Sequence, residues 1–145
     1  MKLLVGKFIH QIKDAISIGE NAELTKNKKT ISNVLIIGLG GSGIGGKIVT
    51  QLTSNQLQVP VSINNDYNIP NYVNENTLVI ASSFSGNTEE TLEALSIVQE
   101  KQAEIACITS GGKLLTIAKE KGYNYIVLPT ERSPRAMLTY SLIQQ

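Results

Sequence analysis

The sequence predicts an α/β fold: a three-layer sandwich in which helices cover both faces of a five-stranded parallel sheet. Two observations support it. Short apolar runs alternate with segments of helical periodicity along the 145 residues, a pattern typical of parallel strands joined by crossover helices. Turns rich in glycine or serine join several of these runs to the helix that follows. A single domain of this length and pattern fits the flavodoxin-like sheet order 2-1-3-4-5.

The chain begins with a predicted amphipathic helix over residues 3–18, because its apolar side chains recur at helical spacing. His10, the only histidine, lies off this stripe and is expected to face solvent. The polar residues 21–29 then link the helix to a first strand at residues 33–37. The expected stripe consists of Val5, Phe8, Ile9, Ile12 and Ile16.

Six glycines lie between Gly38 and Gly46, directly after the first strand, and a helix is expected over residues 43–52. A buried strand that passes through glycines into a helix brings backbone N–H groups and the positive end of the helix dipole to one place. Such a place suits an anion, usually a phosphate.

The rest of the chain repeats the strand–turn–helix unit. The further expected strands cover residues 58–64, 77–81, 103–108 and 124–128, and residues 65–76 form a turn-rich loop. One helix is expected after Glu90, a second at residues 114–121 and a last one at residues 135–143. Gly122 suits the residue that ends the second of these helices, and Pro134 suits the first turn of the last.

Two unusual turns follow the first and third strands: residues 38–46, and residues 82–88, which we call the serine loop. In the order 2-1-3-4-5 these two strands are neighbours, so both turns lie at the same edge of the sheet. The crevice at that edge is the expected ligand site of an open α/β sheet.

The glycine stretch alone permits two nucleotide-binding interpretations. Gly38, Gly40 and Gly43 match the dinucleotide pattern G-x-G-x-x-G, with Asp66 near the end of the second strand as a ribose-binding acid. Gly41, Gly46 and Lys47 also satisfy the P-loop pattern. However, Ile48 stands where a P-loop needs a hydroxyl to bind magnesium, which argues against that interpretation.

The serine loop favours a third interpretation, a sugar-phosphate pocket. Ser83, Ser85 and Thr88 offer three hydroxyls around Gly86 where a helix begins. Hydroxyl donors, backbone N–H groups and a helix dipole together can hold a phosphate dianion without a lysine, and Gly86 lets the chain approach it closely.

A plainer explanation of the serine loop is that it only stabilises the start of the next helix. Ser85 or Asn87 would cap that helix, and Glu89 and Glu90 would complement its dipole. Capping accounts for one hydroxyl, and the loop carries three. The pocket therefore remains the preferred interpretation.

Composition excludes several classes of partner. A net charge of +1 without a basic run gives no indication of nucleic-acid binding. No apolar run reaches the length of a membrane span, and the start of the chain does not resemble a signal peptide, so a cytoplasmic protein is expected. Cys107, the only cysteine, lies in an apolar run and is expected to be a buried structural thiol.

Three stretches of the sequence resemble the sugar isomerase (SIS) domain family. They are residues 38–43 (Gly-Leu-Gly-Gly-Ser-Gly), 82–91 (Ser-Ser-Phe-Ser-Gly-Asn-Thr-Glu-Glu-Thr) and 133–136 (Ser-Pro-Arg-Ala). In order and spacing they are most similar to the first domain of bifunctional phosphoglucose/phosphomannose isomerases. The resemblance covers about residues 30 to 140 and implies the SIS fold.

The resemblance also implies a reaction and residue roles. The reaction would interconvert glucose 6-phosphate or mannose 6-phosphate with fructose 6-phosphate through a cis-enediolate, with no metal or organic cofactor, in a homodimer. Arg135 would stabilise the negative charge of the enediolate. Without that role it would be a surface arginine in the first turn of a helix, where a cation is unfavourable. The implied substrate-binding residues are Gly41, Ser42, Ser83, Ser85, Gly86 and Thr88.

The sequence departs from this family in its catalytic base. Family members carry the glutamate base and a histidine in a second SIS domain, to which residues 134–145 would lead, whereas this sequence ends at Gln145 and offers only His10. Glu131 is the best-placed carboxylate here, because Glu89 and Glu90 are expected to be weakened as bases by the helix end. We therefore expect a phosphosugar-binding half-enzyme that is inactive alone. The alternatives are a stand-alone regulatory SIS module and, below it, an NAD-binding domain.

Overall fold

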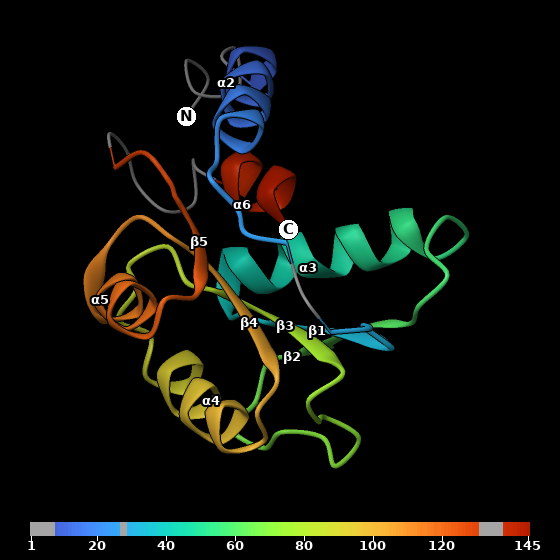
Figure 1. Cartoon of the computed structure of the whole chain (residues 1–145). Coiled ribbons are helices and arrows are strands. Elements are labelled where there is room, and N and C mark those ends of the chain that lie inside the picture. The colour runs from blue at the N-terminus through green and yellow to red at the C-terminus, as the bar shows by residue number, and fades with distance from the viewer. Residues whose placement is uncertain (1–7, 27–28, 131–137) are drawn as a thin grey trace.

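A computed structural model describes residues 8–26, 29–130 and 138–145 of the chain (Figure 1). Five parallel strands form one sheet in the order β2-β1-β3-β4-β5. The α/β class and the sheet order predicted from the sequence are therefore confirmed. The strands are β1 (Asn33–Ile37), β2 (Val61–Asn64), β3 (Thr77–Ser82), β4 (Glu104–Thr109) and β5 (Asn124–Val127).

The strand β1 lies inside the sheet because strands pair with it on both sides. Val34 is in register with Val61 of β2 and with Leu78 of β3. The strand therefore needs apolar side chains on both faces, and Leu35, Ile36 and Ile37 are all buried. The chain turns to β2 on one side of β1 and to β3 on the other, which makes the end of β1 the point where the strand order reverses.

One face of the sheet packs against α4 (Glu89–Glu100) and α5 (Gly112–Lys121) (Figure 1). The larger core cluster lies here and joins the odd-numbered strand residues Leu35, Val79 and Cys107 to Leu95 of α4 and Leu114 of α5. Alternate residues of each strand point to this face, so the same strands supply the opposite core as well. The helix α5 ends where the sequence predicts, with Gly122 left-handed at a φ of 69°.

The other face carries α3 (Gly40–Thr53) and α6 (Leu138–Gln144), with α2 (Phe8–Glu20) packed outside α6 (Figure 1). Hydrogen bonds hold α6 to α2. The Thr139 hydroxyl donates to Gln11 Oε1 at 3.2 Å, and the Tyr140 hydroxyl donates to Asp14 Oδ2 at 2.7 Å. The C-terminal helix is thus enclosed between α2 and α3.

The described part of the first predicted helix does not bury the predicted apolar stripe; residues 3–7 of that helix, including Val5, lie outside the described residues. The buried residues of α2 are Gln11 and Ala15, whereas Ile9 is 71% exposed and Phe8 is 48% exposed. Ala15 is small enough for α6 to approach closely. The polar side chain of Gln11 can be buried in the same contact because the Thr139 hydroxyl donates a hydrogen bond to it. His10 is exposed as expected.

The helix α3 begins at Gly40, three residues before the predicted start. Most of the glycines are therefore part of the helix, and Gly43 and Gly46 allow close packing there. A Cβ on Gly43 would lie 2.7 Å from the carbonyl oxygen of Gly38, and one on Gly46 would lie 3.0 Å from Ile36 Cγ2. The strand β2 is also shorter than predicted, because the ladder starts after Pro60.

None of the helices in the described ranges is long and apolar enough to cross a membrane. The last of them, α6, corresponds to the later part of the helix predicted at residues 135–143. The first residues of that predicted helix, 135–137, and Pro134 before it lie outside the described residues.

Burial makes a testable prediction about the single thiol. Cys107 lies in the core, and burial raises the pKa of its thiol to about 12. Because the thiolate is the reactive form, we expect no reaction of the folded chain with Ellman's reagent at pH 8, and reaction of one thiol per chain in denaturant. Rapid reaction of the folded chain would contradict the buried position.

Candidate functional site

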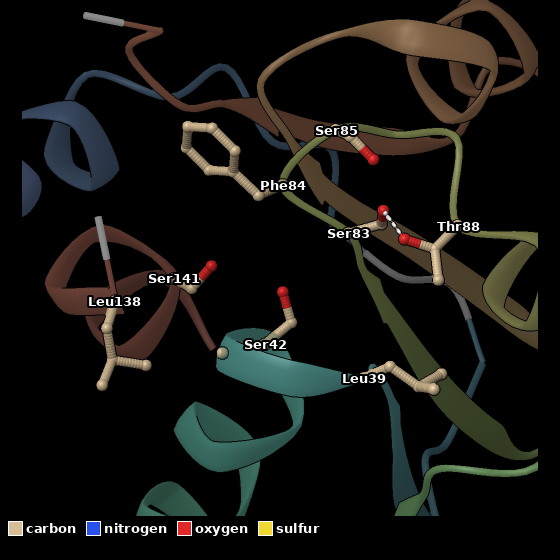
Figure 2. A pocket seen from close by; sticks show the side chains of 9 residues that line it. Leu39, Ser42, Ser83, Phe84, Ser85, Thr88, Leu138 and Ser141 are labelled. Carbon is tan, nitrogen blue, oxygen red and sulfur yellow. Dashed lines mark hydrogen bonds between the residues drawn. The ribbon is translucent and has the colours of Figure 1, made fainter. Parts of the chain in front are cut away.

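A cavity of about 180 Å³ lies at the carboxyl ends of β1 and β3, where the strand order reverses (Figure 2). This is the edge at which the sequence places the ligand site. Three segments enclose the cavity: the start of α3, the serine loop and α6. Its lining residues are Leu39, Gly41, Ser42, Ser83, Phe84, Ser85, Thr88, Leu138 and Ser141.

Hydrogen bonds within the serine loop hold its hydroxyls in place. The backbone N–H of Gly86 donates to Ser83 Oγ at 3.1 Å, and Ser83 Oγ lies 2.8 Å from Thr88 Oγ1 (Figure 2). The backbone N–H of Asn87 donates to Ser85 Oγ at 3.2 Å. Three hydroxyls are thus fixed on one wall of the cavity before any ligand arrives, which lowers the entropic cost of binding.

The serine loop is locked to the turn between β4 and α5. The backbone N–H of Ser110 donates to the carbonyl oxygen of Phe84 at 3.0 Å, and the N–H of Leu114 donates to that of Gly86 at 2.9 Å. The side chain of Asn87 accepts from the N–H of Lys113 at 3.1 Å. The conformation of the loop is therefore set by contacts outside the cavity.

Gly86 is the residue on which this locking depends. Its φ is 68°, in the left-handed region that favours glycine, and a Cβ there would lie only 1.8 Å from the carbonyl oxygen of Gly111. Gly86 does not line the cavity. Its predicted contact with a phosphate stays a prediction, and the structure shows that it lets the serine loop pass against the neighbouring turn.

The helix α4 begins at the serine loop without a side-chain cap. Thr88 is the residue at its N-cap, and no side chain accepts a hydrogen bond from the first turn there. Asn87, considered as a cap for this helix, instead caps α5 through Lys113. The first turn of α4 therefore leaves backbone N–H groups and the positive end of its dipole beside the three hydroxyls, an arrangement that favours an anion.

The opposite wall comes from the first turn of α3. Gly41 and Ser42, two of the predicted substrate-binding residues, both line the cavity. The side chain of Ser42 points toward the space beneath the serine loop (Figure 2). Its hydroxyl has no hydrogen-bond partner among the described residues, although the residue is only 6% exposed. A ligand group or water in the cavity would supply that partner.

Sequence reasoning missed the contribution of α6. Leu138 and Ser141 line the cavity, and no pattern in the sequence marks them because the contact depends on how α6 crosses α3. The predicted residues Arg135 and Glu131 lie outside the described residues. Of the predicted substrate-binding residues, the structure brings Gly41, Ser42, Ser83, Ser85 and Thr88 together around the cavity.

The geometry does not favour the two nucleotide-binding interpretations. Lys47 is an exposed residue well inside α3 and does not line the cavity, unlike the lysine of a P-loop. Asp66 accepts a hydrogen bond from the backbone N–H of Tyr67, so its carboxylate already serves the local turn. Two glycines of the G-x-G-x-x-G match pack the start of α3 against the end of β1, since a Cβ on Gly43 would lie 2.7 Å from the carbonyl oxygen of Gly38.

No acidic side chain lines the described part of the cavity wall. Glu89 and Glu90, at the start of α4, are not among its lining residues. Across the described residues, no group of three or more histidine, cysteine, aspartate or glutamate residues could hold a metal ion. The described wall can therefore hold and orient a polar anion, and it offers no carboxylate to move a proton.

The contact of Gly86 with Gly111 predicts a specific stability effect. Gly86→Ala should lower the free energy of unfolding by about 2 kcal/mol or more, because the alanine would be strained at positive φ and would meet backbone. Gly41→Ala is the matched control, since nothing lies within 4 Å of a Cβ there. Urea denaturation measures both, and equal stability of the two variants would contradict the contact.

Comparison with known proteins identifies the family of the chain. The SIS domain family model matches residues 28–145. The bifunctional phosphoglucose/phosphomannose isomerase of Caldicellulosiruptor bescii is 46% identical over 133 residues, which is 92% of this chain and 39% of the relative. The enzyme of the same description from Thermoplasma acidophilum is 44% identical over 111 residues, which is 77% of this chain and 34% of the relative. The chain thus spans well under half the length of these relatives.

The fold also matches solved structures. A protein of Clostridium difficile 630, provisionally described as a phosphosugar isomerase, superposes with a TM-score of 0.75 at 21% identity. That match covers 97% of this chain and 42% of the other. The family match extends over the glycine stretch, the serine loop and α6, the three segments that enclose the cavity. The chain therefore belongs to the SIS domain family.

Proposed function

We propose that this chain is the phosphosugar-binding half of an aldose–ketose isomerase that interconverts glucose 6-phosphate or mannose 6-phosphate with fructose 6-phosphate. One observation carries the proposal. Three hydroxyls, on Ser83, Ser85 and Thr88, lie beside the uncapped start of α4 and face one cavity. The similarity to bifunctional phosphoglucose/phosphomannose isomerases suggests which sugars to test.

The serine-loop wall suits a phosphomonoester dianion. Hydrogen bonds to a charged acceptor are shorter and about twice as strong as neutral ones, so several hydroxyl and backbone donors replace a lysine. The dipole of α4 adds a favourable contribution at the same end of the cavity. In the free chain the Ser83 and Thr88 hydroxyls pair with each other, and this pair can turn its protons toward an arriving phosphate.

The remaining walls suit a sugar. Leu39, Phe84 and Leu138 offer apolar surface for the C–H faces of a sugar, and Ser42 offers a hydroxyl. With the phosphate at the serine loop, the sugar carbons would extend toward α3 and α6. The serine loop would then bind the charged group, and the other two walls would orient the sugar.

In the proposed reaction, a base takes the proton from carbon 2 of the aldose to give a cis-enediolate. Return of a proton to carbon 1, with transfer of the hydroxyl proton from oxygen 2 to oxygen 1, gives the ketose. We propose that Arg135 stabilises the developing negative charge. The base is assigned to residues beyond the described wall of the cavity, which contains no carboxylate. The family resemblance assigns the base to a residue outside this chain, which would then bind the substrate and stabilise the intermediate without proton transfer of its own.

A second candidate, a phosphosugar-binding regulatory module, is favoured by that same lack of a carboxylate in the described wall. Both candidates need the serine-loop pocket. They differ in whether Arg135 serves a reaction or only binding. The homodimer implied by the family also remains a proposal, and the exposed apolar side chains of α2, Phe8 and Ile9, offer one surface for it.

Calorimetric titration of the chain with fructose 6-phosphate tests the pocket. Ser83→Ala and Ser85→Ala should each weaken binding about 10- to 100-fold, because a hydrogen bond to a charged group contributes about 1.5–3 kcal/mol. Ser96→Ala is the matched control, since this serine is exposed on α4 and bonds only to the carbonyl oxygen of Glu93. It should bind as the unmodified chain does.

Two results would refute the pocket: no binding of fructose 6-phosphate by the unmodified chain, or equal binding by all three variants. NAD serves as the competing ligand. Binding of NAD without binding of sugar phosphates would instead support the dinucleotide interpretation of the glycine stretch.

A further inference from the structure

We propose that Ser141, on α6, is a further substrate-binding residue that contacts the sugar part of the ligand and contributes to the choice between sugars. The inference rests on the proposed function, because it takes the serine-loop pocket as a phosphosugar site. It goes beyond that function by assigning a role to α6, which no motif in the sequence marks.

Ser141 is a buried residue whose hydroxyl has no hydrogen-bond partner among the described residues. The residue is 4% exposed, it lines the cavity, and its hydroxyl makes no hydrogen bond to the part of the chain that the structure describes. It is not among the fully enclosed polar atoms that lack a partner, so it keeps access to the cavity. A hydroxyl in this position gains from a ligand that supplies a hydrogen bond, because leaving it unsatisfied has a free-energy cost.

The other hydroxyls of α6 show that this arrangement is specific to one face of the helix. Thr139 lies two residues earlier, about 200° around the helix, and its hydroxyl bonds to Gln11 of α2. The Tyr140 hydroxyl donates to Asp14, which is also on α2. These two residues attach α6 to α2, whereas Ser141 faces the cavity.

Close packing of α6 on α3 brings Ser141 next to Ser42. A Cβ on Gly45 would lie 3.5 Å from the Cα of Leu142, so the missing side chain lets the two helices approach. The side chain of Gln145 donates to the backbone carbonyl of Ser42 at 3.0 Å. Ser42 and Ser141 are thus two buried residues on one side of the cavity, and neither hydroxyl has a hydrogen-bond partner within the described residues (Figure 2).

This pair lies on a different wall from the phosphate-binding hydroxyls. In Figure 2, Ser42 lies between Ser141 and the Ser83–Thr88 pair. Leu138, also from α6, adds apolar surface beside Ser141. With the phosphate at the serine loop, Ser141 therefore meets the sugar carbons and their hydroxyl groups. Its contribution should appear with a sugar phosphate and be absent with phosphate alone.

The test compares Ser141→Ala with Thr139→Ala, two variants that each remove a hydroxyl from α6; Thr139→Ala also removes a methyl group. Calorimetric titration uses inorganic phosphate and fructose 6-phosphate. Ser141→Ala should weaken fructose 6-phosphate binding about 3- to 10-fold and leave the phosphate affinity within about twofold. Thr139→Ala should lower the melting temperature and leave both affinities unchanged, because its hydroxyl faces α2.

A series of deoxy analogues of the sugar phosphate locates the contact. Ser141→Ala and the unmodified chain should bind the analogue that lacks the contacted hydroxyl with equal affinity, since the hydrogen bond is absent from both complexes.

Unchanged binding of fructose 6-phosphate by Ser141→Ala would overturn the inference. So would an equal loss for phosphate and for the sugar phosphate, because that result indicates a purely structural effect. Both results leave the serine-loop pocket intact if Ser83→Ala still weakens binding. Failure of the unmodified chain to bind fructose 6-phosphate would instead overturn the proposed function and this inference together.

Discussion

The contact between the serine loop and the turn after β4 is the constraint on which the candidate site depends. Gly86 passes so close to the carbonyl oxygen of Gly111 that no side chain fits between them. The N–H of Leu114 then bonds to the carbonyl oxygen of Gly86. Because two adjacent turns lock each other, the three hydroxyls and the start of α4 are fixed before a ligand binds. Preorganisation of this kind favours anion binding by a wall whose described residues include no lysine, since little conformational entropy would be lost on binding.

The second constraint is the close approach of α3 to β1 and α6. Glycines serve this approach: Gly43 lies against the backbone of Gly38, and Gly45 faces the backbone of α6 near Leu142. Helix packing therefore explains the glycine-rich turn after β1 without a nucleotide-binding site. The same packing brings the backbone carbonyl of Ser42 within hydrogen-bond distance of the Gln145 side chain. It also places α6, from the far end of the sequence, against the cavity.

Local patterns in the sequence predict much of this structure. The alternation of apolar runs with helices predicts the sheet order, and the position of the serine loop after β3 predicts the place of the cavity. Features that depend on tertiary contact are not predicted in this way. The buried face of α2 is set by Gln11 and Ala15 because α6 packs there, although Ile9 and Phe8 form the more apolar stripe. For the same reason, nothing in the sequence near Ser141 indicates that it reaches the cavity.

If the serine loop and the start of α4 hold a phosphate, their backbone amides must respond when it binds. A ¹⁵N NMR titration of the chain with fructose 6-phosphate, followed through these amides, tests this directly. We expect the largest shifts at residues 83–90, with smaller ones at Gly41 and Ser42, because the phosphate would accept hydrogen bonds from the first of these segments. Shifts confined to the glycine stretch, or an unchanged serine loop at saturating ligand, would contradict a phosphate site at the start of α4.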